Sequence, residues 1–203
     1  MKIFCFGDSI THGSNDLVLG GWVNRLNLYL ENKPDFEGSI FNLGISGETT
    51  KGLIERFNQE SKTRIKEKDV NNIFIFAYGA NDSAIINESD SFKVDVNDFK
   101  ENLIKAITEA KKFSSKIFIL TITPVVEESA VISRSGKYFR SNDYIKKYND
   151  KIEEIVKEQN IEIIDINSVY TNKSYKDLFT EDGLHPNDKG HELIFKTVVN
   201  KII

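Results

Sequence analysis

The chain has 203 residues, a length typical of one domain with a sizeable buried core. Hydrophobic residues make up 39% of it, charged residues 29%, and the formal net charge is −4, as in a globular protein in water. Lysines and glutamates are interleaved without a basic block, which argues against a nucleic-acid-binding surface. We therefore expect one domain over residues 1–203 that binds no nucleic acid.

Neither the single cysteine nor the N-terminus points to an exported or membrane-spanning protein. Cys5 is alone, so it forms no intramolecular disulfide, and its apolar neighbours predict a core position. The first residues lack the separate apolar stretch and cleavage site of a signal peptide. No segment reaches the ~18 apolar residues of a membrane span. We expect a cytoplasmic protein; a leader removed before residue 1 would overturn that expectation.

Five short apolar runs predict the strands of a parallel sheet. They cover residues 3–6, 39–43, 73–78, 117–122 and 161–166, and they are rich in Ile and Phe. Buried parallel strands are apolar on both faces, whereas half-exposed antiparallel strands alternate apolar and polar residues.

The segments between these runs have the period of amphipathic helices. Their stripes are Val23, Leu26 and Leu30; Leu53, Ile54 and Phe57, after a cap at Thr49 or Thr50; Phe99, Leu103, Ile107 and Ala110; Ile145, Tyr148, Ile152 and Ile155; and Leu193, Ile194, Val198 and Ile202. Strands alternating with helices predict an α/β fold with helices on both faces of the sheet. Ligands bind such sheets at the carboxyl ends of the strands. Two long loops, 83–97 and 124–142, are candidates for a lid or pocket wall there.

Candidate catalytic groups follow the first three runs. Ser9 comes after the first, in Gly7-Asp8-Ser9, although Thr11 stands where the G-x-S-x-G nucleophile elbow has its second glycine. Gly44 follows the second run and can offer a backbone N–H to an anion. Asn81 follows the third, and its amide suits a developing oxyanion. Taken singly, these motifs are better explained by a helix cap, a turn and an Asx turn than by catalysis.

A late loop offers a base and an acid. His185 is one of only three histidines, and Asp182 precedes it by three residues. A carboxylate at the Nδ1 side of the imidazole fixes its tautomer, so that the other nitrogen can take a proton from Ser9. The loop also fits a simple cap of the last helix through Asn187 or Asp188. The combination of nucleophile, base, acid and oxyanion donors favours an acyl-transfer site.

On these motifs the chain resembles the GDSL-type esterases of the SGNH hydrolase family over nearly its whole length. The family's nucleophile block is matched by residues 7–10, with Ile10 where the family name has leucine, and its glycine block by Gly44. Residues 79–82 match the Gly-x-Asn-Asp block, and residues 182–185 match the Asp-x-x-His block. The resemblance implies a flavodoxin-like three-layer α/β/α sandwich with a five-stranded parallel sheet.

The resemblance also assigns roles to residues. It implies Ser9 as nucleophile, Asp182 and His185 as acid and base, and an oxyanion hole made by the Ser9 N–H, the Gly44 N–H and the Asn81 amide. We therefore expect a serine hydrolase that cleaves small acyl esters through an acyl-enzyme on Ser9, without cofactor or metal.

Other functions remain open at this point. A thioesterase, a lysophospholipase, a carbohydrate O-deacetylase or a transferase would use the same residues, and a non-enzymatic flavodoxin-like binding protein is a more distant alternative. The sequence does not indicate the oligomeric state.

Several further residues are weighed and set aside. Asp8 is expected to have a structural hydrogen-bonding role, and Asp165 is a weaker rival to Asp182 as the acid. His12 and His191 are expected to be structural or solvated. Arg140 lies in the 124–142 loop and is able to meet an anionic substrate group, although a solvated side chain is the simpler expectation. No cluster has the ligand spacing of a zinc site.

Overall fold

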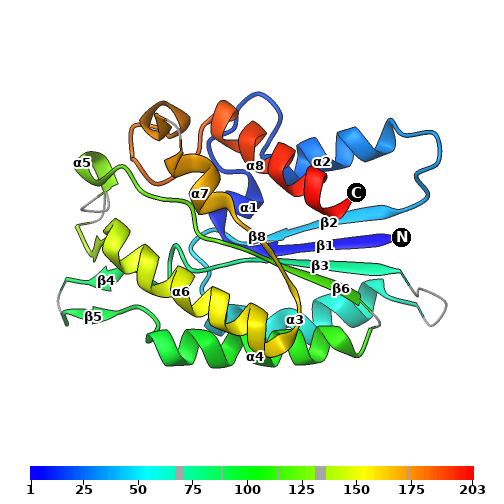
Figure 1. Cartoon of the computed structure of the whole chain (residues 1–203), viewed down its shortest axis with the longest axis horizontal. Helices are drawn as coiled ribbons and strands as arrows, with labels where there is room; N and C mark the ends of the chain where they lie inside the picture. Colours follow the sequence, from blue (N-terminus) through cyan, green and yellow to red (C-terminus); the bar gives the residue numbers. More distant parts are fainter. Residues whose placement is uncertain (67–70, 88, 114, 131–135, 173) are drawn as a thin grey trace.

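A five-stranded sheet runs through the middle of the computed structural model, with strand order β2-β1-β3-β6-β8 (Figure 1). The structure describes residues 1–66, 71–87, 89–113, 115–130, 136–172 and 174–203. All neighbouring strands of this sheet pair in parallel. Each strand overlaps one of the five apolar runs, so the predicted parallel sheet is confirmed, although the last strand ends at Ile164 and Ile166 of the predicted run already lies in a helix. They are β1 (Lys2–Gly7), β2 (Ser39–Gly44), β3 (Asn72–Ala77), β6 (Ser115–Leu120) and β8 (Glu162–Ile164).

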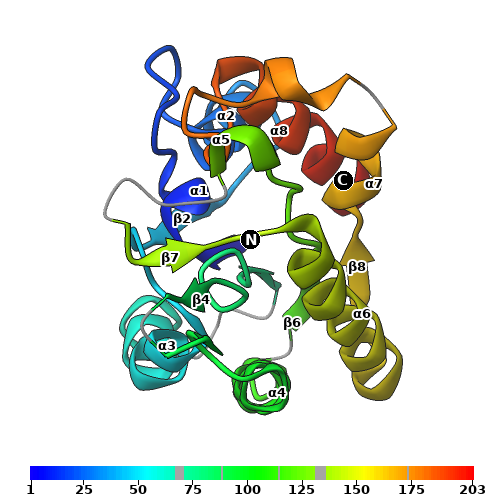
Figure 2. The same cartoon turned by 90° about the vertical axis from the view of Figure 1, so that its left-hand side faces the viewer.

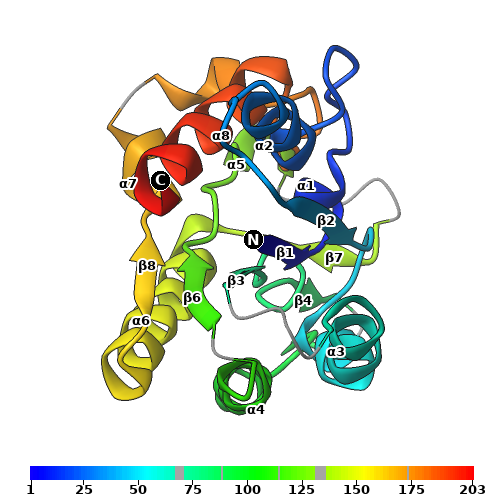
Figure 3. The same ribbon diagram turned by 90° about the vertical axis from the view of Figure 1, so that its right-hand side faces the viewer.

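Helices cover both faces of the sheet, which confirms the three-layer α/β/α arrangement (Figures 1 and 3). One face carries α3 (Thr50–Arg64), α4 (Val96–Lys111) and α6 (Asn142–Gln159), and the other carries α2 (Trp22–Glu31), α7 (Ile166–Thr171) and α8 (Asp188–Ile202). Successive side chains of a strand point to opposite faces. Phe4 and Phe6 of β1 therefore pack in one core, while Ile3 and the fully buried Cys5 pack in the other.

The two long loops join each other at the carboxyl edge of the sheet. The first contains β4 (Ile85–Ile86) and β5 (Ser91–Phe92), and the second contains α5 (Glu127–Ala130) and β7 (Tyr138–Phe139). Strand β4 pairs antiparallel with both β5 and β7, so the loops form one three-stranded sheet, which we call the small sheet (Figure 2). Residue 88 of the first loop and residues 131–135 of the second lie outside the described residues.

The first turn of helix α3 is capped by the carboxylate of a residue that is distant in the sequence. Thr49 is its N-cap residue, as expected, but the Thr49 side chain makes no capping hydrogen bond. Instead, Asp82, in the loop after β3, accepts hydrogen bonds from the backbone N–H and the hydroxyl of Thr50. This link fixes the loop after β3 against α3.

In the described part of the chain, none of the helices could serve as a transmembrane span.

Candidate active site

Ser9 stands where β1 gives way to the one-turn helix α1 (Ser9–His12). Asp8 caps this helix, because its Oδ1 accepts a hydrogen bond from the Ile10 N–H at 2.9 Å. Gly7 leaves no room for a side chain, since a Cβ there would lie 2.1 Å from Thr11 Oγ1 and 2.8 Å from the Ala77 carbonyl oxygen. The tight strand-to-helix turn therefore fixes Ser9 at the carboxyl edge of the sheet.

The structure brings Ser9, His185 and Asp182 into one hydrogen-bonded chain. Ser9 Oγ lies 2.8 Å from His185 Nε2, and His185 Nδ1 lies 2.7 Å from Asp182 Oδ2. The side chains of His185 and Asp182 are 20% and 19% exposed, so the chain is partly shielded and still reachable from solvent. This geometry is that of a nucleophile, a base and an orienting acid.

The Asp182 carboxylate is held by its own loop. Its Oδ1 accepts hydrogen bonds from the backbone N–H groups of Leu184 and His185 and from the Thr180 hydroxyl. Partial burial acts to raise the pKa of Asp182. The hydrogen bonds from the His185 side chain and from the backbone outweigh burial and hold this pKa well below its usual range. Asp182 is therefore ionised at neutral pH and accepts from His185 Nδ1.

The residues that were set aside have other roles. Asp165 caps α7 by accepting from the Ser168 N–H, and it also accepts from the Thr121 hydroxyl. His12 is exposed. His191 is fully buried, and burial lowers its pKa to about 4, so its imidazole is neutral at pH 7. None of these three side chains contacts the Ser9–His185–Asp182 chain within the described residues.

Asn81 lies beside the nucleophile turn. Its side chain is buried, and Nδ2 lies 3.1 Å from the Glu48 carbonyl oxygen and 3.3 Å from Asp8 Oδ2. The Asp8 contact is near the long end of the hydrogen-bond range, so it is the weaker of the two. The Asn81 amide is thus held by its hydrogen bond to the Glu48 carbonyl oxygen. Its weaker contact with Asp8 Oδ2 can be replaced by a hydrogen bond to a ligand.

Gly44 and Gly47 differ in whether their N–H groups are available. The Gly44 N–H donates to Asn42 Oδ1 at 3.0 Å, and a Cβ on Gly44 would lie only 2.2 Å from the His12 backbone nitrogen. Gly47 has φ 79°, in a turn closed by the Glu48 N–H and the Ile45 carbonyl oxygen. In the described part of the chain, the N–H groups of Gly47 and Ser9 donate to no acceptor. Gly47 was not predicted from the sequence, although Ser46-Gly47 follows Gly44 in the same short block.

A partly buried network holds the turn that carries Gly47. Glu48 Oε1 accepts from Arg56 Nε at 2.7 Å, and Glu48 Oε2 accepts from the Tyr78 hydroxyl at 2.6 Å. Burial disfavours the charged guanidinium, but the hydrogen bond to Glu48 outweighs it and raises the pKa of Arg56. This network fixes Glu48, and with it the carbonyl oxygen that anchors Asn81.

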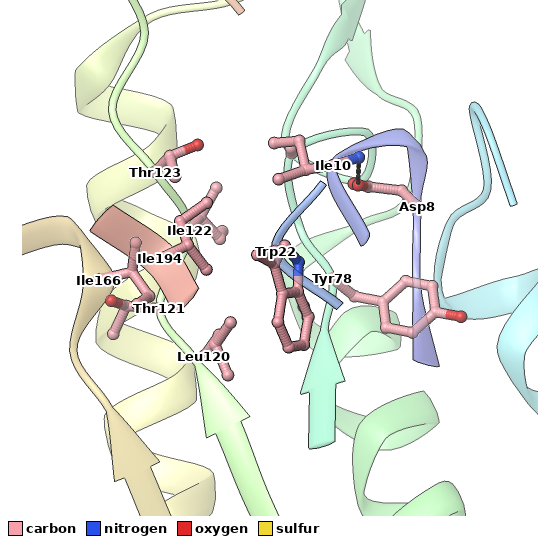
Figure 4. A pocket seen from close by; sticks show the side chains of 12 residues that line it. Asp8, Ile10, Trp22, Tyr78, Leu120, Thr121, Ile122, Thr123, Ile166 and Ile194 are labelled. Atoms are coloured by element: carbon pink, nitrogen blue, oxygen red, sulfur yellow. Dashed lines mark hydrogen bonds between the residues drawn. The ribbon is translucent and has the colours of Figure 1, made fainter. Parts of the chain in front are cut away.

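A small cavity lies beneath the nucleophile turn (Figure 4). Ile10 and Trp22 face Leu120 and Ile122 across it, whereas the Tyr78 hydroxyl points away (Figure 4). Its volume is about 30 Å³, room for about two water molecules and too little for an acyl chain. Its lining includes neither Ser9 nor His185. This cavity is therefore not the binding site for a substrate's acyl chain.

The described residues contain no group of three or more His, Cys, Asp and Glu side chains arranged to hold a metal ion.

Comparison with known proteins identifies the family. The GDSL-like Lipase/Acylhydrolase family matches residues 5–193. The chain belongs to this family. It is 25% identical over 203 residues to the human isoamyl acetate-hydrolyzing esterase 1 homolog, an alignment that covers 96% of this chain and 78% of that protein.

Solved structures of esterases share the fold of this GDSL-family chain. The lipase/acylhydrolase from Enterococcus faecalis superimposes with a TM-score of 0.78 at 27% identity, covering 99% of this chain and 94% of that one. A variant of an acetyl xylan esterase from Geobacillus stearothermophilus has a TM-score of 0.74 at 18% identity, with coverage of 98% and 93%. The chain is a carboxylic ester hydrolase, and the alternative of a non-enzymatic flavodoxin-like binding protein is set aside.

Proposed function

We propose that this GDSL-family enzyme cleaves acyl esters in two steps through an acyl-enzyme on Ser9, with His185 as base and Asp182 as the orienting acid. The observation that carries the proposal is the hydrogen-bonded chain from Ser9 Oγ to His185 Nε2, 2.8 Å apart, and from His185 Nδ1 to Asp182 Oδ2, 2.7 Å apart. Its substrates are small-molecule esters.

In the first step, His185 Nε2 takes the Ser9 proton while Ser9 Oγ attacks the ester carbonyl carbon. The imidazolium that forms is stabilised by ionised Asp182. His185 then gives the proton to the departing alcohol, which leaves an ester of Ser9. In the second step, His185 takes a proton from water, the hydroxide attacks the acyl-enzyme, and the proton returns to Ser9 as the acid leaves.

The negative charge on the carbonyl oxygen needs donors that are free before the substrate binds. We assign this role to the Ser9 N–H, the Gly47 N–H and the Asn81 amide. The first two donate to no acceptor among the described residues, and the Asn81 amide can exchange its 3.3 Å contact with Asp8. Gly47 takes the place expected for Gly44, because the Gly44 N–H is occupied by Asn42.

The decisive experiment measures turnover of p-nitrophenyl acetate and butyrate by the wild-type enzyme, Ser9→Ala and the control Ser14→Ala. We expect Ser9→Ala to lower kcat at least about 1,000-fold, as loss of a serine nucleophile does, and Ser14→Ala to leave it within about threefold. A fluorophosphonate reagent should modify Ser9 alone, as read by peptide mass spectrometry. Undiminished turnover by Ser9→Ala, or modification elsewhere, would refute the mechanism.

The same assay distinguishes the functions that share this chemistry. Acyl thioesters, lysophospholipids and acetylated sugars are tested beside the simple esters, again with Ser9→Ala as the control. We expect oxygen esters of small acids to give the highest kcat/KM. A higher kcat/KM for one of the other classes would assign the enzyme to that class without changing the roles of Ser9, His185 and Asp182.

A further inference from the structure

Two cationic side chains near the oxyanion donors have no part in the mechanism above. Arg140 follows β7, and Lys93 follows β5, so both are supplied by the small sheet at the carboxyl edge (Figure 2). The sequence suggested a solvated Arg140, but its side chain is buried, with only 7% of the residue exposed.

The Arg140 guanidinium is short of acceptors. Its Nε donates to the Ala80 carbonyl oxygen over a long 3.4 Å, and this is its only hydrogen bond to a described residue. No ion pair joins Arg140 to a carboxylate in the described ranges. A guanidinium has five N–H donors, and burying them without acceptors is costly. Within the described residues the guanidinium is therefore left with N–H donors that can bind an acceptor on a ligand.

Arg140 also lies within electrostatic reach of the reacting groups. Burial lowers its pKa, and the charges of Asp8 and Asp182 oppose that effect. Asp8 precedes the nucleophile, and Asp182 orients the base. Hydrogen bonds already engage both acids, since Asp8 accepts from Ile10 and Asn81, and Asp182 accepts from His185 and its own loop.

Lys93 contacts the turn that carries the Gly47 N–H. Its Nζ donates to the Gly47 carbonyl oxygen at 3.2 Å and lies 5.1 Å from the centroid of the Tyr138 ring. Burial and the charge of Arg140 lower its pKa, which places the two cations in one electrostatic neighbourhood. Arg140 thus contacts the residue before Asn81, and Lys93 contacts Gly47. Both cations therefore contact the backbone of segments that carry proposed oxyanion donors.

We propose that Arg140 and Lys93 form a subsite for a carboxylate carried by the substrate, so that the preferred esters are monoanions such as half-esters of dicarboxylic acids. The planar guanidinium matches a carboxylate with two parallel hydrogen bonds, and the ammonium adds a point charge. The neighbouring acids Asp8, Asp82 and Asp182 disfavour a dianion such as a phosphate monoester. This inference rests on the proposed ester hydrolysis at Ser9 and names the substrate class.

The test compares kcat/KM for the neutral ester p-nitrophenyl acetate and for the anionic ester mono-p-nitrophenyl glutarate. We expect Arg140→Gln to lower the anionic-to-neutral ratio about 10- to 100-fold, as loss of a charged hydrogen bond does, and Lys93→Gln to lower it about 3- to 10-fold. Lys147→Gln is the matched control, because this exposed lysine also lies over a ring of the small sheet, that of Phe92, but makes no contact with the oxyanion donors. An unchanged ratio, or an equal loss for both esters, would overturn the proposal.

Two further measurements keep the test independent of folding and of turnover. Lys93→Gln changes a side chain that is only partly buried, so its effect on the anionic-to-neutral ratio can be measured even if Arg140→Gln is unstable. Calorimetric titration of Ser9→Ala with the monoanionic half-ester monomethyl glutarate, and with neutral dimethyl glutarate as control, needs no catalysis. We expect monomethyl glutarate to bind at least tenfold more tightly than dimethyl glutarate, and the added Arg140→Gln change to remove the difference. Equal binding of the two ligands would contradict the proposed subsite but leave the mechanism intact. Full turnover by Ser9→Ala would contradict the proposed mechanism but leave the subsite intact.

Discussion

The carboxylate of Asp82 anchors the first residue of helix α3, because its Oδ1 accepts hydrogen bonds from the Thr50 N–H at 2.9 Å and from the Thr50 hydroxyl at 2.6 Å. Asp82 is fully buried and directly follows Asn81. Asn102 of α4 also donates to the Thr50 hydroxyl oxygen. The loop that presents the Asn81 amide is therefore tied to two helices at one point.

Removing the Asp82 carboxylate should destabilise the fold. We expect Asp82→Ala to lower the free energy of unfolding by about 2–4 kcal/mol, because it leaves two buried Thr50 donors without an acceptor. Asp82→Asn keeps an oxygen acceptor and should lose less than about half as much. Urea denaturation measures both, with Asp98→Ala as a control for an exposed acid near a helix start. Equal stability of Asp82→Ala and Asp98→Ala would contradict this role.

The buried acids also predict how stability depends on pH. Burial raises the pKa of both Asp8 and Asp82 to about 6, above the ~3.9 of an aspartate in an unfolded chain. Between about pH 4 and pH 6 these two acids therefore hold protons in the folded state that they have released in the unfolded state, which makes the free energy of unfolding fall as the pH rises. Two groups act in the opposite direction: Asp182, through its lowered pKa, only below about pH 4, and buried His191, through its lowered pKa, between about pH 4 and pH 6.5.

We expect the free energy of unfolding to be about 1 kcal/mol higher at about pH 4.5 than at about pH 7, because two acids gain protons in the folded state while His191 gains one in the unfolded state. Asp82→Asn, which leaves one such acid, should remove this difference. Urea denaturation across this range measures it. A free energy of unfolding that rises steadily over the same interval would show that other groups dominate.

Asn81→Ala tests the oxyanion assignment. We expect kcat to fall about 100-fold or more with little change in KM, which is the usual effect of removing one oxyanion donor. Circular dichroism should show an intact fold. The control is Asn32→Ala, at the exposed end of α2, whose amide donates only to the Leu28 carbonyl oxygen. A folded Asn81→Ala enzyme with wild-type kcat would remove Asn81 from the oxyanion hole.

Gly44→Ala should act through the position of Ser9. The added Cβ would lie 2.2 Å from the His12 backbone nitrogen, so α1 must shift, and Ser9 begins that helix. We expect a loss of at least about 2 kcal/mol in stability and a fall in kcat. Gly136→Ala is the matched control: it has φ 69° but open space around it, so it should cost only about 1 kcal/mol. Wild-type thermal stability of Gly44→Ala would contradict the close packing.

The sequence predicted those parts of the molecule that repeat a period or carry a motif. The run at residues 73–78 corresponds to β3 (Asn72–Ala77), because a buried parallel strand needs apolar residues on both faces. Ser9, Asp182 and His185 were chosen from the sequence for their chemistry, and the structure places them within hydrogen-bonding distance.

Other features depend on contacts that no local pattern records. Strands β4 and β7 have two residues each, too few to produce a period. Gly44 and Gly47 are the same residue type in one short block, and only the backbone decides which N–H stays free. Arg140 stands between Phe139 and the polar Ser141, a local pattern that does not predict the burial of its side chain in the folded protein.

The pairing of Ile85 with Phe139 joins two loops that the chain inserts separately, after β3 and after β6. A change of length or sequence in one of them alters the edge against which the other pairs. The proposed subsite, with Lys93 on one loop and Arg140 on the other, then depends on both loops together. In loop-grafting experiments, segments 83–97 and 124–142 should be transferred together, because either one alone would leave β4 with an unmatched edge.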